Sequence, residues 1–155
     1  MNIAKLIISI LICQGAGIIG SIFTASSIPT WYATLKKPSF NPPNWLFAPA
    51  WITLFFLMGI SLYLVWGRGL ENEKVKTALV IFAVQLALNV AWSLLFFGLK
   101  SPLWALIEIV ILWLVILVNI VSFYGISKPA GLLLLPYILW VSFAAVLNFF
   151  VFRLN

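Results

Sequence analysis

The side chains best able to do chemistry in this chain are aromatic rings and amides that recur on single helical faces. Gln85, Asn89, Trp92 and Phe96 follow an i, i+4, i+7, i+11 spacing, which places them on one face of a helix. A second stripe, nearer the carboxyl end, comprises Tyr137, Trp140, Ala144 and Leu147. Asn148 lies beside it. Trp51 and Phe55 share a third face. Such surfaces suit a flat, mostly apolar ligand that needs a few oriented hydrogen bonds.

The eight tryptophans of the chain fall into two groups by position. Four lie near the ends of apolar stretches, where membrane proteins carry a belt of interfacial aromatics, and need no further function: Trp31, Trp45, Trp66 and Trp104. Trp51 and Trp140 lie well inside their stretches, Trp51 by about 9 Å of helix. For these two, and for Trp92 and Trp113, the residues alone leave packing and ligand contact open as alternatives.

Several other chemistries lack the residues they need. The chain has no histidine, one cysteine and three acidic residues, which excludes a protein-built zinc site and an axial histidine to haem iron. We therefore expect no built-in metal or cofactor. Glu108 is the one acid inside an apolar stretch, where a carboxylate often marks a functional pathway such as that of a proton-coupled exporter. We expect the simpler alternative, in which it faces the headgroup layer or pairs with Lys100.

The elements that must position these residues follow from composition. The 155 residues are 65% hydrophobic and 8% charged, with a mean hydropathy of +1.18, which is too apolar for a soluble globule. Five stretches are long enough to cross a bilayer as helices. The first is longer than the apolar core of a signal peptide, so we expect it to be a true helix. The sequence predicts an all-α integral membrane protein, a five-transmembrane-helix bundle forming one domain over residues 1–155, with spans at about 5–25, 45–66, 76–98, 102–124 and 130–152.

The net charge of +6 does not indicate a nucleic-acid partner. Lysines and arginines stand singly or in pairs at the ends of the apolar stretches, as membrane anchors do, and form no continuous basic stripe. We therefore expect the lipid bilayer as partner and no nucleic acid. The two sides of the membrane carry five and four basic residues, so charge alone does not fix the orientation.

The segment 26–44 is the one long loop, and its prolines make it stiff and mostly extended. It is long enough to cover one mouth of the bundle as a lid, holding Tyr32, Lys36 and Lys37 over it. On the third span, Ala83, Ala87 and Ala91 recur at the four-residue spacing that lets membrane helices approach closely. Packing within the monomer and a homodimer seam both explain this ladder.

Four segments in order resemble the translocator protein family, whose bacterial members are called tryptophan-rich sensory proteins and whose mammalian members are called peripheral benzodiazepine receptors. They are WYATLKKPSFNPPNWLFAPAW, QLALNVAWSLLFFG, PLWALIE and LPYILWVSFAAVLNFF. The resemblance extends over all five spans. It implies a five-helix bundle, usually a homodimer, with a pocket that opens toward the first loop. Because a helical bundle differs from the barrels of outer membranes, we expect the protein in the plasma (inner) membrane of a bacterium.

The resemblance also implies ligands and site residues. Family members bind porphyrins such as protoporphyrin IX, and some bind isoquinoline-carboxamide or benzodiazepine drugs, or sterols. The positions that match the family's pocket are Tyr32, Pro42, Trp51, Asn89, Trp92, Trp140 and Ala144, with Phe143 and Leu147 as neighbours. Phe55 also faces this pocket, but it stands where relatives often have tyrosine and offers no hydroxyl. The chain lacks the tyrosine of the family's sterol pattern near Arg153, which argues against a dedicated cholesterol site.

These residues favour a receptor for porphyrins and drug-like aromatic ligands. Lys36 and Lys37 are candidate contacts for porphyrin propionates, because their ammonium groups stay solvated in the headgroup zone. Bacterial relatives are associated with light- and oxygen-dependent porphyrin breakdown, for which Trp51 and Trp140 would be the redox partners. A carrier of amphipathic ligands and a ligand-responsive sensor are the alternatives that the sequence leaves open.

Overall fold

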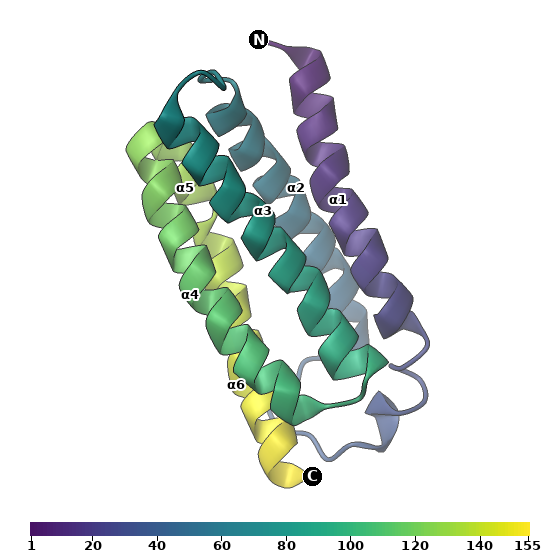
Figure 1. Cartoon of the computed structure of the whole chain (residues 1–155). Helices are drawn as coiled ribbons and strands as arrows, with labels where there is room; N and C mark the ends of the chain where they lie inside the picture. Colours follow the sequence, from purple (N-terminus) through teal and green to yellow (C-terminus); the bar gives the residue numbers. More distant parts are fainter.

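A computed structural model describes all of residues 1–155 and contains helices and no strand. Five of its helical segments are long and apolar enough to cross a membrane, and they run alternately up and down the molecule (Figure 1). The prediction of an all-α, five-helix membrane bundle is confirmed. The segments are α1 (Ile3–Ala25), α2 (Phe47–Trp66) with the preceding 3₁₀ turn Asn44–Leu46, α3 (Glu73–Ser93), α4 (Pro102–Ile126), and α5 (Lys128–Leu133) followed by α6 (Leu135–Leu154).

Polar caps explain where three of these helices begin. Asn2 and Asn72 accept hydrogen bonds from the backbone N–H groups of Lys5 and Lys74, at 3.1 and 2.9 Å, and so start α1 and α3 a few residues before the apolar runs. Ser101 caps α4 in the same way, and Pro102 follows at the first helical position, where its missing N–H costs nothing.

Two spans depart from regular α-helix. The last one is interrupted at Leu134, so α5 and α6 are separate helices, and Pro136 just beyond the break lacks the N–H that a continuous helix would use. After Ser93, α3 continues as a π-helical turn, Leu94–Gly98, in which the Leu99 N–H bonds to the Leu94 carbonyl at 2.7 Å. This turn buries both Phe96 and Phe97 at the lid end of the bundle.

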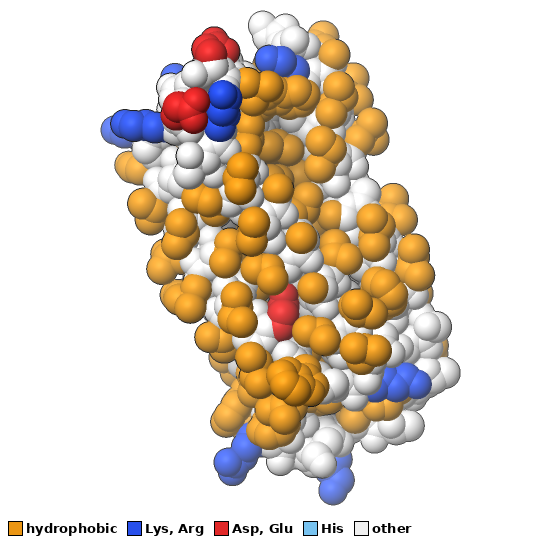
Figure 2. All heavy atoms as spheres, in the orientation of Figure 1, with side chains coloured by type: hydrophobic (Ala, Val, Ile, Leu, Met, Phe, Trp, Pro, Cys, Tyr) orange, Lys and Arg blue, Asp and Glu red, His pale blue; other side chains and the backbone are white.

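The long loop, residues 26–44, covers one end of the helical bundle. α1 packs on α2 and α3, α4 packs on α3 and α6, and α5 packs on α2. The amino terminus and the loop between α2 and α3 lie at one end, whereas segment 26–44 and the carboxyl terminus lie at the other (Figure 1). Figure 2 shows apolar side chains covering the middle of the visible face, with basic ones gathered near both ends. This distribution is that of a helical bundle immersed in a bilayer.

The alanine ladder of α3 lies partly on the outer surface. Ala83 and Ala87 are exposed and Ala91 is half-buried, so most of the ladder does not serve packing within the monomer. The homodimer seam stays a prediction.

The crossing of α1 and α2 depends on a glycine. A Cβ placed on Gly59 would lie 2.7 Å from the Ile10 Cα, so no side chain fits there without separating the two backbones. We expect Gly59→Ala to destabilise the folded protein by about 1–3 kcal/mol through overpacking. Thermal unfolding in detergent, followed by circular dichroism, measures this.

Gly15→Ala is the matched control, because nothing lies within 4 Å of a Cβ at that α1 position. There the better helix propensity of alanine should leave the protein as stable as wild type or slightly more stable. Equal unfolding temperatures for the two variants would contradict the proposed contact.

Candidate functional site

A cavity of about 480 Å³ lies within the lid half of the bundle. Residues of α1, α2, α3 with its π-helical turn, and α6 form its walls, and Tyr32 of the loop contributes to the lid end. Most of the lining side chains are apolar. The size falls within the range of small-molecule sites, which is about 300–1,000 Å³.

The structure brings together most of the side chains expected at the pocket. Eight of them line this cavity: Tyr32, Trp51, Phe55, Asn89, Trp92, Trp140, Ala144 and Leu147. Pro42 and Phe143 do not, contrary to expectation. Phe143 precedes Ala144 by one residue, about 100° around α6, and lines a groove on the outer surface instead. Pro42 lies in the extended part of the lid, where its carbonyl accepts a hydrogen bond from the Asn41 side chain at 3.3 Å.

Two tryptophans meet in the aromatic part of the wall. The ring centroids of Trp51 and Trp140 are 6.4 Å apart with their planes at 87°, and Trp51 stacks on Phe55 at 5.6 Å. Phe47 also contacts Trp140, with the ring centroids 6.2 Å apart. Two indoles at a right angle form a corner against which a flat ring system can stack on one and meet the other edge-on.

The indole N–H groups separate the tryptophans into two kinds. Trp92 Nε1 donates to Asn148 Oδ1 at 3.0 Å, and Trp113 Nε1 donates to Ser142 Oγ at 2.8 Å. The N–H groups of Trp51 and Trp140 make no hydrogen bond within the chain, although both rings line the cavity. Trp113 does not reach the cavity at all. Packing therefore accounts for Trp113, whereas Trp51 and Trp140 each keep a donor available to a ligand.

A chain of buried polar groups supports the amide in the wall. Asn89 Nδ2 donates to the Tyr137 hydroxyl at 2.8 Å, and that hydroxyl donates to Gln85 Oε1 at 2.7 Å. Tyr137 and Gln85 are essentially inaccessible, and Gln85 Nε2 approaches the Met58 sulfur at 3.8 Å. This chain fixes the Asn89 side-chain orientation. Asn89 Oδ1 accepts no hydrogen bond from the protein and is free to accept one from a ligand.

Sequence reasoning missed the wall contributed by α1. Gln14, Gly17, Gly20 and Ser21 line the cavity, although α1 carries no aromatic stripe. A Cβ at Gly17 would lie 2.8 Å from the Phe55 ring, so the glycine lets that ring seat against the helix. The sequence signal that could have identified this wall was the recurrence of small residues at a helical spacing along α1.

The lid is fastened to the bundle at several points. Ser27 Oγ donates to the Phe97 carbonyl at 2.8 Å, where the π-helical turn leaves a carbonyl without its α-helical partner. The Asn155 side chain bonds both to the Lys36 N–H and to the Lys36 carbonyl, at 3.0 and 2.9 Å. The Phe40 ring contacts the Phe150 ring edge-on at 5.5 Å.

Tyr32 and the two lysines occupy different places on this lid. Tyr32 is buried and donates to Asn41 Oδ1 at 3.1 Å. Burial raises the pKa of its phenol, and the hydrogen bond to Asn41 opposes part of that rise. Lys37 Nζ lies 4.7 Å from the Tyr32 ring centroid, in a cation–π contact just outside the cavity. The Lys36 side chain is exposed and does not line the cavity.

Glu108 differs from the expectation. It is only 8% exposed, and neither carboxyl oxygen has a hydrogen-bond partner. Lys100 does not pair with it, and the one salt bridge of the chain joins Lys76 to Glu73 at 3.3 Å. Glu108 belongs to the face of α4 that also buries Ala105 and Leu112, so the helix turns it into the bundle and away from the headgroups.

Together these features define a five-span helical membrane protein with an aromatic cavity under a fastened lid. The model of the TspO/MBR family matches residues 9–154. The chain is 51% identical to the tryptophan-rich protein TspO of Archaeoglobus fulgidus, over 100% of this chain and 99% of that one. It is 40% identical to the translocator protein of Homo sapiens (88% and 82% covered) and 38% identical to the tryptophan-rich sensory protein of Cereibacter sphaeroides (81% and 77% covered). The chain belongs to the TspO/MBR family, and the resemblance seen in its sequence is confirmed.

Proposed function

We propose that this protein is a membrane receptor that binds protoporphyrin IX, or a related tetrapyrrole, in the cavity between α1, α2, α3 and α6. The observation that carries the proposal is the corner formed by Trp51 and Trp140, two rings 6.4 Å apart at 87° with unbonded N–H groups. The apolar lining removes the macrocycle from water, which supplies most of the binding free energy. Asn89 Oδ1 and the two indole N–H groups provide the few oriented hydrogen bonds.

The lid supplies the charge that a porphyrin needs. Its two propionates would lie toward the lid, where Lys37 sits beside Tyr32 and Lys36 is exposed. These ammonium groups lie outside the membrane spans and remain hydrated, so the contact costs little desolvation.

Titration of the purified protein with protoporphyrin IX, followed by quenching of tryptophan emission, tests this function. Saturable quenching is the expected result. We expect Ala144→Phe to weaken binding by roughly tenfold or more, because the added ring fills part of the cavity. Val146→Phe is the control, since Val146 is exposed on the same helix, does not line the cavity, and its variant should bind as wild type does. Equal affinities for both variants, or no saturable quenching in the wild type, would reject the cavity as a porphyrin site.

We further propose that bound protoporphyrin is degraded when it is illuminated in the presence of O₂. The excited porphyrin and O₂ supply the reactivity, so the chain needs no acid–base residues for this step. Its contributions are confinement of the macrocycle and two oxidisable indoles, Trp51 and Trp140, at the contact.

A carrier for amphipathic ligands is the second candidate, and two observations favour it. Ile18 and Ile52 line the cavity but are 64% and 59% exposed, so part of the wall faces lipid, and Glu108 is a buried carboxyl without a partner. One relative is named a translocator protein. Transport predicts porphyrin flux into sealed vesicles that is reduced in Glu108→Gln, whereas photochemistry predicts an absorbance change in detergent without any gradient.

The name of the Cereibacter sphaeroides relative adds the third candidate, a ligand-responsive sensor. This function predicts saturable binding with neither flux nor turnover. Isoquinoline-carboxamide and benzodiazepine-type drugs are proposed as further occupants of the same cavity. We also propose that the protein is a homodimer of the plasma (inner) membrane, with the Ala83–Ala87 face as the seam.

A further inference from the structure

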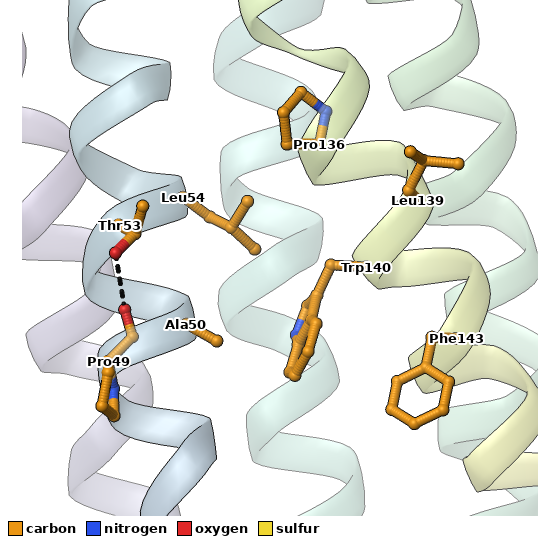
Figure 3. Close-up of a pocket in the computed structure, with 8 residues that line it drawn as sticks. All are labelled: Pro49, Ala50, Thr53, Leu54, Pro136, Leu139, Trp140 and Phe143. Carbon is orange, nitrogen blue, oxygen red and sulfur yellow. Dashed lines mark hydrogen bonds between the residues drawn. The ribbon is translucent and has the colours of Figure 1, made fainter.

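A second hollow lies on the outer surface, between α2 and α6 (Figure 3). It has a volume of about 640 Å³, and its walls are residues of α2 from Pro49 to Leu54 and residues of α6 from Pro136 to Phe143. Its one hydroxyl side chain, Thr53, already donates a hydrogen bond to the Pro49 carbonyl at 2.8 Å, and the only other polar group of its side chains is the Trp140 N–H. The groove therefore offers a largely apolar, bilayer-facing surface.

Trp140 belongs to this groove and to the internal cavity at once. α2 packs on α1, α3 and α5, and α6 packs on α4, but α2 and α6 do not pack closely on each other. The indole of Trp140 projects from α6 into the space between them (Figure 3). Its ring centroid lies 6.2 Å from that of Phe47 and 6.4 Å from that of Trp51. Trp140 is the one side chain that lines both hollows, so its ring lies between the groove and the cavity.

The other walls are held more firmly. Between α1 and α2, Gln14 Nε2 donates to the Ile52 carbonyl at 3.0 Å, and the backbones touch where Gly59 meets Ile10. At the lid end, the Asn155 side chain makes two hydrogen bonds to the Lys36 backbone. The Trp140 ring has no such restraint, because its N–H makes no hydrogen bond, and a change of rotamer moves it without moving any backbone.

We propose that the α2/α6 groove is a lateral entrance, through which a planar apolar molecule dissolved in the bilayer reaches the cavity, with the Trp140 side chain as the movable partition. This inference rests on the proposed porphyrin-binding function and adds the route by which that site is loaded. A macrocycle that already lies among lipid tails enters here without being returned to water, which would cost the hydrophobic free energy that holds it in the membrane.

The first test is kinetic and uses protoporphyrin IX in phosphatidylcholine vesicles that contain the full-length protein. Leu139 lines the groove and is 69% exposed, so Leu139→Trp obstructs the entrance without disturbing the core. Association and dissociation are both expected to slow by roughly tenfold, because the barrier rises equally in the two directions, while Kd stays unchanged. Val146→Trp is the matched control, since Val146 lies two turns farther along α6, is exposed and is outside the groove.

Three other outcomes would overturn the proposed entrance. Wild-type rates in Leu139→Trp would show that porphyrin passes elsewhere, and slowing in Ile18→Trp alone would place the route between α1 and α2. A weaker Kd with an unchanged association rate would make the groove part of the binding site. If the wild type binds no protoporphyrin IX, it is the proposed function that fails.

A second measurement tests access to Trp140 without any porphyrin. The protein is placed in vesicles of phosphatidylcholine brominated at mid-chain, and the emission of Trp140 is taken as the difference between wild type and Trp140→Phe. The groove predicts that bromine quenches this emission strongly, because acyl chains reach the ring from the lipid side. Emission as strong as in unbrominated vesicles would mean that molecules in the bilayer do not reach the partition, and would overturn the proposal whether or not porphyrin binds.

Discussion

Replacement of both Trp51 and Trp140 by phenylalanine is expected to suppress the light-driven loss of bound protoporphyrin IX by roughly tenfold or more while binding persists. Phenylalanine keeps a flat apolar ring at each position but removes two N–H donors, so the binding free energy weakens by about 1–3 kcal/mol in total. It removes the readily oxidised indole at the two positions that meet at 6.4 Å in the cavity wall. The absorbance of the porphyrin under steady illumination, with and without O₂, measures the effect.

Two single variants serve as controls for this experiment. Trp92→Phe changes a ring that lines the same cavity, but one whose N–H is engaged with Asn148. Trp113→Phe changes a ring outside the cavity. Both should retain most of the turnover. Loss of turnover in either control to the level of the double variant, or full turnover in the double variant, would contradict the roles given to Trp51 and Trp140.

Composition and helical periodicity were enough to predict the bundle, because a bilayer imposes both length and polarity on each span. The helix ends were less predictable. Apolar runs locate the hydrocarbon-facing part of a helix, whereas Asn2 and Asn72 set the actual starts of α1 and α3 by capping. Pro136 is a local signal for the break at Leu134, whereas no proline marks the π-helical turn at Leu94–Gly98.

The same distinction applies to the cavity. Stripes on α3 and α6 placed Asn89, Trp92, Trp140 and Ala144 on one wall, because residues at helical spacing share a face whatever the tertiary structure. Assigning Phe143 to that wall ignored its position about 100° around the helix. The contribution of α1 was missed because its small residues form no aromatic or amide stripe, and Gly17 acts only by letting the Phe55 ring approach.

Glu108 shows a limit of the same reasoning. Its place in the sequence is compatible with either the headgroup layer or the bundle interior, and only the rotation of α4 decides between them. That rotation is set by the whole face that buries Ala105, Ile109 and Leu112, so Glu108 is carried inward with its neighbours. Burying a carboxyl without a partner lowers the stability of the folded protein, and such a residue within a membrane span points to a role beyond packing.

Removal of a single hydroxyl at Tyr137 is expected to weaken both the fold and the binding of protoporphyrin IX, although Tyr137 does not line the cavity. The hydroxyl accepts from Asn89 and donates to Gln85, so Tyr137→Phe leaves two buried amides each short of a partner. The cost is about 1–3 kcal/mol for each stranded group. Asn89 also loses the hydrogen bond that fixes its side-chain orientation. Its Oδ1 is then no longer held in one position to accept a hydrogen bond from the ligand.

Tyr124→Phe is the matched control, because it makes the same chemical change on an exposed tyrosine of α4 that has no hydrogen-bond partner. Thermal unfolding and a protoporphyrin IX titration of both variants separate the two effects. We expect Tyr124→Phe to match wild type in both measurements. If Tyr137→Phe binds as tightly as Tyr124→Phe while unfolding at a lower temperature, the polar chain serves the core alone, and the orientation of Asn89 does not determine affinity. If Tyr137→Phe matches Tyr124→Phe in both unfolding temperature and affinity, the Tyr137 hydroxyl does not link the core to the cavity as its two short hydrogen bonds indicate.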